Sequence, residues 1–399
     1  MALLRWELKK IWRPGLLLAI ALIGVVFYNV RPGFYLKYFN TGDSWGAAQV
    51  QLSYGWLETY GNAIEPEERP GLDAQLAELE GEFARQAAQI PSAAEAGVTD
   101  YESYVAWVKA YNSGTWSDEA NALDREIYSN TNWVILSSLV EFMEEYDFLN
   151  GGGSVVDWGG DIGEDSPAHQ ASVRRIQEAE AEGVYGFLPS MVKDSTNNFF
   201  HYFAIWCTFS GVLLISPTLV RDGLRRTRVM QWTSRRGRRV LYTQMGAALL
   251  SGLLLTLLNC AAYLGPFLST GALKFQDCSM VSVWRWDYPW FDWSYGQYLL
   301  ALLGLTFALT LAACGFTVVL SQFSGSYVAM LLKAIPLIVA LCWGIVSWTM
   351  AGAGLFSSRI VRLTGLPGTE FACGVLAVLA ALGLCGWTCF RHRRRELVG

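Results

Sequence analysis

The stretch QYLLALLGLTFALTLAACGFTVVL, residues 297–320, contains no charged side chain. A helix rises about 1.5 Å per residue, so this stretch is long enough to cross the roughly 30 Å hydrocarbon core of a membrane. Five further segments share this apolar character, and the sequence therefore predicts an all-α polytopic membrane protein with six transmembrane helices. The predicted spans are residues 14–30, 198–220, 241–267, 297–320, 327–351 and 371–390.

The composition agrees with a membrane protein, because 52% of the 399 residues are hydrophobic, 16% are charged and the mean hydropathy is +0.26. Residues 31–197 carry 9 Lys and Arg against 28 Asp and Glu, whereas the rest of the chain carries 21 against 7. This separation argues against a soluble single-domain enzyme, a nucleic-acid-binding protein and a disordered chain. The eight cysteines lie mostly in apolar runs, with only Cys278 in an expected exposed loop, so we predict no disulfide framework.

Basic residues near the ends of the spans predict the orientation, because such residues stay on the cytoplasmic side. With six spans, three basic segments fall on one side, and both termini are then cytoplasmic. These segments are residues 1–13, 221–240 and 391–399. Residues 31–197, 268–296 and 352–370 then lie outside. No small-x-small cleavage site follows residues 14–30, so we interpret this segment as an uncleaved anchor. The outer segment contains no N-x-[ST] acceptor, which agrees with a bacterial source, and we expect a multi-pass protein of the bacterial plasma membrane.

The outer segment 31–197 is long enough for a domain, and its patterns predict a mostly helical one. One helical face carries Leu72, Leu76, Leu79, Phe83, Ala87 and Ile90. Ser166 and Pro167 predict the start of a helix that runs to about Glu182, and residues 118–148 also read as helical. Thr99 and Glu102 resemble a capping box before a further helix.

Two acidic clusters in this segment have the residue types of acid–base or calcium sites, but solvated acidic surface is the interpretation we favour. They are Glu141, Glu144 and Glu145, and Asp157, Asp161, Glu164 and Asp165. His169 is an isolated histidine, and His201 is expected to form a hydrogen bond near the outer end of its span. No catalytic, cofactor-binding or metal-binding motif is found, and no G-x-x-x-x-G-K-[ST] loop for ATP is present.

Three features of the later spans leave alternatives open. Residues 281–293 are rich in Trp and Tyr, which favours an interfacial position, with a ligand-stacking platform as the alternative. Lys333 is expected to extend to the cytoplasmic headgroups, with a functional intramembrane charge as the alternative, and Pro336 predicts a kink. Small residues in 371–390 suit packing within the chain as well as a dimer interface.

The most informative segment is RDGLRRTRVMQWTSRRGRRV, residues 221–240, which carries eight arginines and one acid. It serves as an orientation signal, binds anionic lipid headgroups, or forms a short amphipathic helix that meets a partner. Its layout, together with a basic helix at residues 3–13 and six spans, resembles the permease subunit of type 2 ATP-binding-cassette exporters. In this chain the matching positions are Asp222 and Gly223, followed by the turn Ser234-Arg235-Arg236-Gly237-Arg238.

The resemblance implies that residues 221–240 form a coupling connector to a separate cytoplasmic ATPase and that residues 1–13 form an elbow helix. The implied ATPase contacts are Asp222, Gly223, Arg225, Arg226, Arg228, Ser234, Arg235, Arg236, Gly237, Arg238 and Arg239, and the elbow residues are Trp6, Lys9, Lys10 and Arg13. It also implies a re-entrant outer segment at 352–370. The large insert at 31–197 exceeds what minimal members of the family carry.

The resemblance further implies export of a peptide, lipid or antibiotic-like substrate by two permease halves, identical or different. ATP and Mg²⁺ would bind to the ATPase partner, so this chain itself is expected to be a transport component and not an enzyme. The alternative is a membrane-anchored sensor or accessory protein whose acidic outer domain binds a peptide. An intramembrane enzyme is disfavoured because the spans lack paired catalytic groups.

Overall fold

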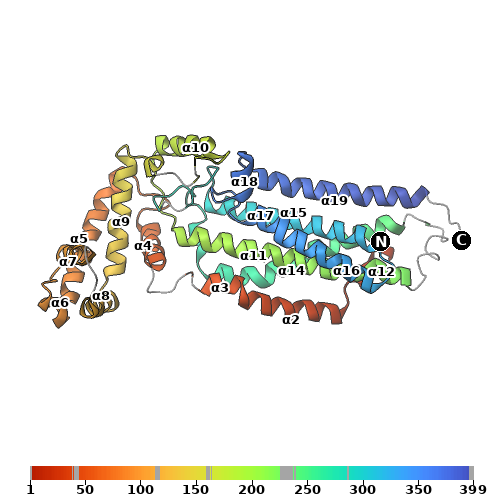
Figure 1. Ribbon diagram of the computed structural model, residues 1–399, viewed down its shortest axis with the longest axis horizontal. Helices are drawn as coiled ribbons and strands as arrows, with labels where there is room; N and C mark the ends of the chain where they lie inside the picture. Colours follow the sequence, from red (N-terminus) through yellow and green to blue (C-terminus); the bar gives the residue numbers. More distant parts are fainter. Residues whose placement is uncertain are drawn as a thin grey trace.

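The computed structural model describes residues 2–37, 39, 45–112, 117–158, 162, 164–224, 237, 240–284 and 287–394. Within these ranges every regular element is a helix, so the predicted all-α fold is confirmed for them. Figure 1 shows long helices side by side along the longest axis and a group of shorter helices beyond one end. We call the two parts the bundle and the body. The end of the bundle that carries α1 and α12 is called the basic end, and the opposite end is called the body end.

Among the residues that the structure describes, five helices of the bundle are long and apolar enough to cross a membrane, as expected of a multi-pass membrane protein. They are α11 (Ser190–Ile215), α14 (Val240–Ser269), α15 (Tyr295–Gln322), the run Tyr327–Met350 and α19 (Thr369–Arg394, apolar as far as Arg391). The predicted first span is α2 (Pro14–Val30), which has 17 residues. It is long and apolar enough for a span only when it is taken together with α1 (Ala2–Ile11). The two helices meet at a bend of 49°. Six spans therefore stay a prediction.

The central helices of the bundle are α11 and α15, in which 67% and 56% of an 18-residue apolar stretch is buried within the protein. The run Tyr327–Met350 and α19 lie at the periphery, where 17% and 28% of the corresponding stretch is buried. Trp343 is 80% exposed, and such apolar faces suit a lipid environment. Small residues of α19 pack within the chain, because a Cβ at Gly315 of α15 would lie only 2.9 Å from the Cβ of Ala381.

Two of the predicted spans are divided into more than one helical segment. The second predicted span, 198–220, is observed as α11 and a separate helix α12 (Pro217–Leu224), which extends into the connector. The predicted kink near Pro336 takes the form of a π-helical segment. Here α16 (Tyr327–Ile338) is followed by η5 (Val339–Val346) and α17 (Ser347–Met350). Proline lacks the backbone donor that an α-helix needs, and the altered hydrogen bonding follows within one turn.

The body is mostly helical, as predicted. Its elements are α3 (Pro32–Lys37), α4 (Trp45–Thr59), η1 (Pro66–Glu68), α5 (Arg69–Ala87), α6 (Pro91–Glu95), α7 (Tyr101–Asn112), α8 (Asp118–Asn130), α9 (Trp133–Asn150), η2 (Val155–Trp158) and α10 (His169–Glu182).

The prediction that residues 118–148 are helical is confirmed, with a turn at 131–132 that divides the stretch into α8 and α9. Two other local predictions for the body are wrong in detail. The helix predicted from Ser166 starts at His169, and the Ser166 hydroxyl lies 3.3 Å from the backbone nitrogen of Ala168. The cap of α7 is Asp100, whose carboxylate accepts a 2.8 Å hydrogen bond from the backbone of Ser103.

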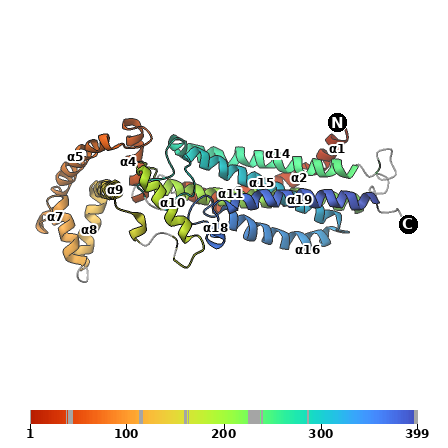
Figure 2. The same ribbon diagram turned by 90° about the horizontal axis from the view of Figure 1, so that it is seen from above.

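The body has two cores. The near part, with α4 and α9, shares one continuous core with the bundle, to which Trp56 and Phe142 belong. The far part, α5 to α8, has a second core around Phe83 and Ile127, to which Leu136 at the start of α9 also belongs. Figure 2 shows the same division, since α5, α7 and α8 lie farthest from the long helices. The near part of the body is therefore packed onto the bundle as one unit.

Candidate functional site

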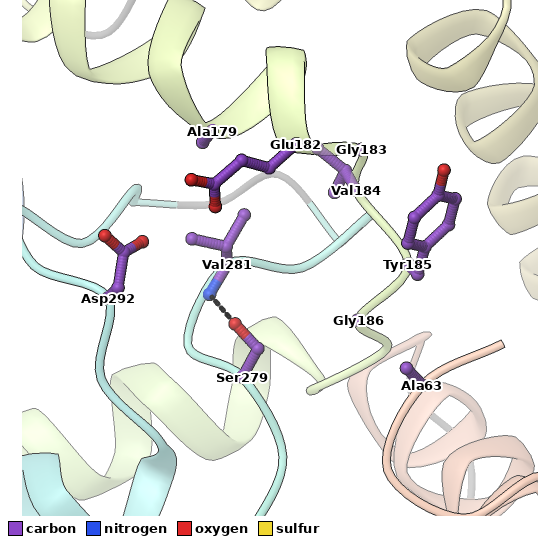
Figure 3. A pocket seen from close by; sticks show the side chains of 10 residues that line it. All are labelled: Ala63, Ala179, Glu182, Gly183, Val184, Tyr185, Gly186, Ser279, Val281 and Asp292. Carbon is purple, nitrogen blue, oxygen red and sulfur yellow. Dashed lines mark hydrogen bonds between the residues drawn. The ribbon is translucent and has the colours of Figure 1, made fainter. Parts of the chain in front are cut away.

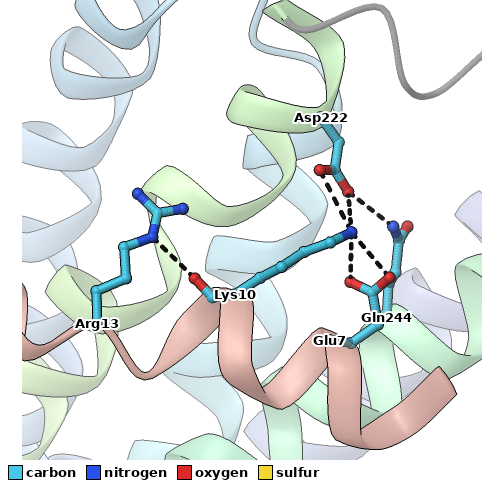
Figure 4. Close-up of polar contacts among 5 residues, drawn as sticks. All are labelled: Glu7, Lys10, Arg13, Asp222 and Gln244. Atoms are coloured by element: carbon cyan, nitrogen blue, oxygen red, sulfur yellow. Dashed lines mark hydrogen bonds and ion pairs between the residues drawn. The ribbon is translucent and has the colours of Figure 1, made fainter. Parts of the chain in front are cut away.

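The elbow helix α1 meets the start of the connector in a cluster of charged and polar side chains at the basic end. The ammonium of Lys10 lies 2.9 Å from Glu7 Oε1 and 3.1 Å from Asp222 Oδ2. The amide of Gln244 donates a 2.9 Å hydrogen bond to the same Asp222 oxygen. Figure 4 shows that Lys10 lies between the two carboxylates. We call these four residues the elbow cluster.

The elbow cluster is largely removed from water. Glu7, Asp222 and Gln244 are 2%, 6% and 7% exposed, and the Lys10 side chain is 33% exposed. Charges in such a place need close partners, because their attraction must offset the loss of hydration. The cluster joins α1, α12 and α14, and the indole of Trp12 adds a 3.0 Å hydrogen bond to Ser251 of α14. These contacts tie α12 to α1 and to α14, which is a membrane-length helix.

The structure brings together two of the predicted site residues, Lys10 and Asp222. Gly223 lies beside Asp222 in α12, and Gly237 has a φ of 51°, a conformation that glycine adopts at little cost and that suits the predicted turn. The other connector residues lie outside the described ranges: Arg225, Arg226, Arg228, Ser234, Arg235, Arg236, Arg238 and Arg239.

On α1, Trp6 is 65% exposed, with the ammonium of Lys9 5.3 Å from its ring centre. The guanidinium of Arg13 donates a 2.9 Å hydrogen bond to the carbonyl of Lys10. Sequence reasoning missed Glu7 and Gln244. Glu7 could have been found, because it stands three residues before Lys10, a spacing that places two side chains on one helical face.

At the body end, loop 270–294 and loop 351–368 are joined to each other and to the body. The backbone of Trp290 donates a 2.9 Å hydrogen bond to Gly354, and Phe356 donates one of 2.9 Å to Tyr288. The backbone of Val283 donates a 2.8 Å hydrogen bond to Gly186, which precedes α11. Loop 270–294 includes η4 (Ala272–Phe275), and loop 351–368 includes α18 (Arg359–Thr364). These bonds make the loops a rigid connection between body and bundle.

Three aromatic side chains of loop 270–294 lie inside the protein. Trp284, Tyr288 and Trp290 are 3%, 2% and 5% exposed, so packing against protein replaces the headgroup contact we expected for them. The Trp290 and Phe356 rings are 4.4 Å apart, centre to centre. Cys278, expected to be exposed, is fully buried. The expectation was wrong because the body covers the loop, which the local sequence does not indicate.

The side chain of Asp287 links loop 270–294 to loop 351–368. Its φ is 61°, in the left-handed region that few non-glycine residues adopt, and its carboxylate accepts a 2.7 Å hydrogen bond from the backbone of Ser357. Burial raises the pKa of Asp287 to about 6, although the hydrogen bonds from Ser357 and the charge of Lys193 act in the opposite direction. The side chain of Lys193 is itself buried and donates a 3.3 Å hydrogen bond to the carbonyl of Trp284.

A cavity of about 180 Å³ lies between the end of α10 and residues 279–292. In Figure 3 the carboxylate of Glu182 lies above Val281 and that of Asp292 lies to its left. Asp292 also forms an ion pair with Arg175, whose guanidinium donates a 3.3 Å hydrogen bond to the carbonyl of Pro289. Because Arg175 pairs with Asp292, Glu182 supplies the negative charge at the opening, which favours a cationic group over an anionic one.

The remaining sequence candidates have local roles. His201 lies 3.2 Å from the hydroxyl of Ser347, and the ammonium of Lys333 donates a 2.8 Å hydrogen bond to the carbonyl of Phe323 at the turn before α16. His169 contacts the carbonyl of Ile162 at 2.9 Å. Among the described residues, no group of three or more His, Cys, Asp and Glu side chains is arranged to hold a metal ion. Comparison of the chain with protein-family models, curated proteins and solved structures found no match.

Proposed function

We propose that this chain is the membrane permease subunit of an ATP-binding-cassette exporter. A separate ATPase would bind ATP and Mg²⁺ and contact the connector 221–240 and the elbow helix from the cytoplasm. A second permease half, identical or different, would complete the transport path through the bacterial plasma membrane. A peptide, a lipid or an antibiotic-like molecule would be the substrate.

The elbow cluster is the observation that carries this proposal. Asp222 is the only acid of the arginine-rich connector, and it is held by Lys10 of α1 and Gln244 of α14. A force that a partner applies to the connector therefore reaches α14 directly and α2 through α1. Such a linkage suits a protein whose energy source lies in another chain, and it agrees with the lack of a nucleotide-binding loop in this sequence.

Co-purification tests the proposal. The tagged chain, expressed together with the products of its genomic neighbours, should bring down an ATPase. Replacing Arg235, Arg236, Arg238 and Arg239 with Gln should weaken that association. A matched control replaces the four arginines of the tail, Arg391, Arg393, Arg394 and Arg395, and should leave it intact. Failure to recover any ATPase would refute the proposal. If only the insertion topology changes in the connector variant, the connector is an orientation signal.

The alternative is a sensor or accessory protein whose body binds a peptide. The cavity beside Glu182 favours it, because the Glu182 carboxylate at the junction of body and bundle suits a basic group of a ligand. The two functions differ in whether ATP is hydrolysed in response to the ligand. Ligand-stimulated ATP hydrolysis by the reconstituted complex supports transport, whereas ligand binding to the body without any hydrolysis supports the sensor.

A further inference from the structure

A groove opens sideways between α2, α11 and α14, and it begins at Trp12, two residues after Lys10 of the elbow cluster. Its volume is about 460 Å³, which falls in the range of roughly 300–1,000 Å³ that is usual for sites that bind small molecules. The groove starts at Trp12 and Leu17 near the basic end and reaches Tyr28 and Pro266. Val25 and Leu258 form its exposed rim, at 62% and 55% exposure.

The floor of the groove is apolar because its polar atoms are used within the protein. The indole of Trp206 donates a 3.2 Å hydrogen bond to Asn259, whose amide donates one of 3.0 Å to Ser210. The hydroxyl of Tyr263 donates a 2.7 Å hydrogen bond to the carbonyl of Gly24. Gly24 is required here, since a Cβ at this position would lie 2.7 Å from the Trp206 ring. A hydrocarbon chain fits such a floor better than a sugar or a peptide does.

The length of the groove and the charge at its entrance indicate which kind of lipid fits. From residue 17 to residue 28, α2 rises about 16 Å, close to half of the roughly 30 Å hydrocarbon thickness, which is the reach of one lipid leaflet. At the Trp12 end, α1 and the residues after it carry Arg5, Lys9, Lys10 and Arg13 against Glu7 alone. Glu7 and Asp222 both contact Lys10, and the net charge around the groove entrance stays positive.

We propose that the groove binds one acyl chain of an anionic phospholipid, with the lipid phosphate beside the basic residues of α1. Basic residues at a membrane surface attract anionic headgroups, and the groove adds a shaped site for the chain. The bound lipid would separate α2 from α14 at the place where the elbow joins the bundle. This proposal is independent of the transport function, since a sensor could bind the same lipid.

The experiment uses the full-length chain in phosphatidylcholine vesicles with a small fraction of photoreactive phosphatidylglycerol, whose diazirine lies in the middle of one acyl chain. After irradiation, mass spectrometry identifies the labelled peptides. We expect the label to concentrate on residues 17–28 and 255–266, above the level on the peripheral helices α16 and α19. Photoreactive phosphatidylcholine should label the groove at least about fivefold less, the effect of one basic contact.

Variants make the test specific. Ala21→Phe with Ala262→Phe places two rings in the groove from its wall and should remove most of the label there. Ala380→Phe, at an exposed position of α19, is the matched control and should leave it unchanged. Arg5→Gln with Lys9→Gln, both at exposed positions, should abolish the preference for phosphatidylglycerol without filling the groove.

Three results would overturn the proposal. The first is equal labelling of all lipid-facing helices, which would indicate only the surrounding bilayer. The second is equal labelling by the two lipids. The third is a cross-link from a cysteine placed at position 21 to a second copy of the chain, with loss of lipid label at the groove, which would make that copy the occupant.

Discussion

Replacing Lys10 with Met is expected to destabilise the basic end by about 2–3 kcal/mol, somewhat less than the ~3–5 kcal/mol lost when a fully buried ion pair loses one partner. The expected loss of stability is smaller because Lys10 is partly exposed to water. The variant leaves Glu7 and Asp222 facing each other in a buried place without the ammonium that lies between them. The measurement is the midpoint of thermal unfolding of the purified chain in detergent, followed by tryptophan fluorescence.

Two controls make this prediction specific to the elbow cluster. Lys9→Met removes a neighbouring exposed lysine that lies over the Trp6 ring and should change the midpoint little. Adding Glu7→Gln and Asp222→Asn to Lys10→Met removes all three charges, and most of the lost stability should return. If Lys10→Met unfolds at the same temperature as Lys9→Met, the cluster does not hold the elbow in place.

Asp287→Asn is expected to remove a pH dependence from the stability of the body end. The native pKa of Asp287 is about 6, against an ordinary value of 3.8, so the folded protein binds a proton more tightly there than the unfolded chain does. The stabilisation from this group is complete below about pH 4 and is lost as the pH rises through about 6. A difference of about two pKa units corresponds to about 3 kcal/mol.

The measurement compares unfolding midpoints of the two proteins between pH 4 and pH 7. The parent chain should lose stability relative to Asp287→Asn as the pH rises, and the difference should level off near pH 7. Asparagine is the suitable replacement, because it tolerates the left-handed conformation and keeps an oxygen for the backbone of Ser357. Parallel curves for the two proteins would show that Asp287 does not titrate in this range.

The all-helical architecture could be predicted because apolar runs of membrane length are local signals. The predicted segment 14–30 coincides with α2, and 241–267 lies within α14. The start of α11 could not be predicted in this way, since its first turns carry Lys193, Thr196 and Asn197, which lower the hydropathy. These polar groups are buried through partners on α15 and the loops, such as Tyr295, whose hydroxyl lies 2.6 Å from that of Thr196.

The candidate site was predictable only in part, for a similar reason. The family resemblance singled out Asp222 and Lys10, but their pairing depends on how α1 folds back against α12 and α14. At the other end, the Trp-rich loop suggested a lipid interface, whereas the body and residues 351–358 enclose Trp284 and Trp290. Burial of this kind arises from segments distant in sequence, and no local periodicity encodes it.

Side-specific labelling tests the central claim most directly, namely that the basic end faces the cytoplasm and can meet an ATPase there. Single cysteines replace Gly237 in the connector and Glu119, an exposed residue of α8 in the body. The unmodified chain, labelled in the same way, shows how much of the signal comes from its native cysteines. We predict that a membrane-impermeant maleimide labels position 119 in intact cells and position 237 only after permeabilisation. Labelling of position 237 in intact cells, with position 119 protected, would contradict the account.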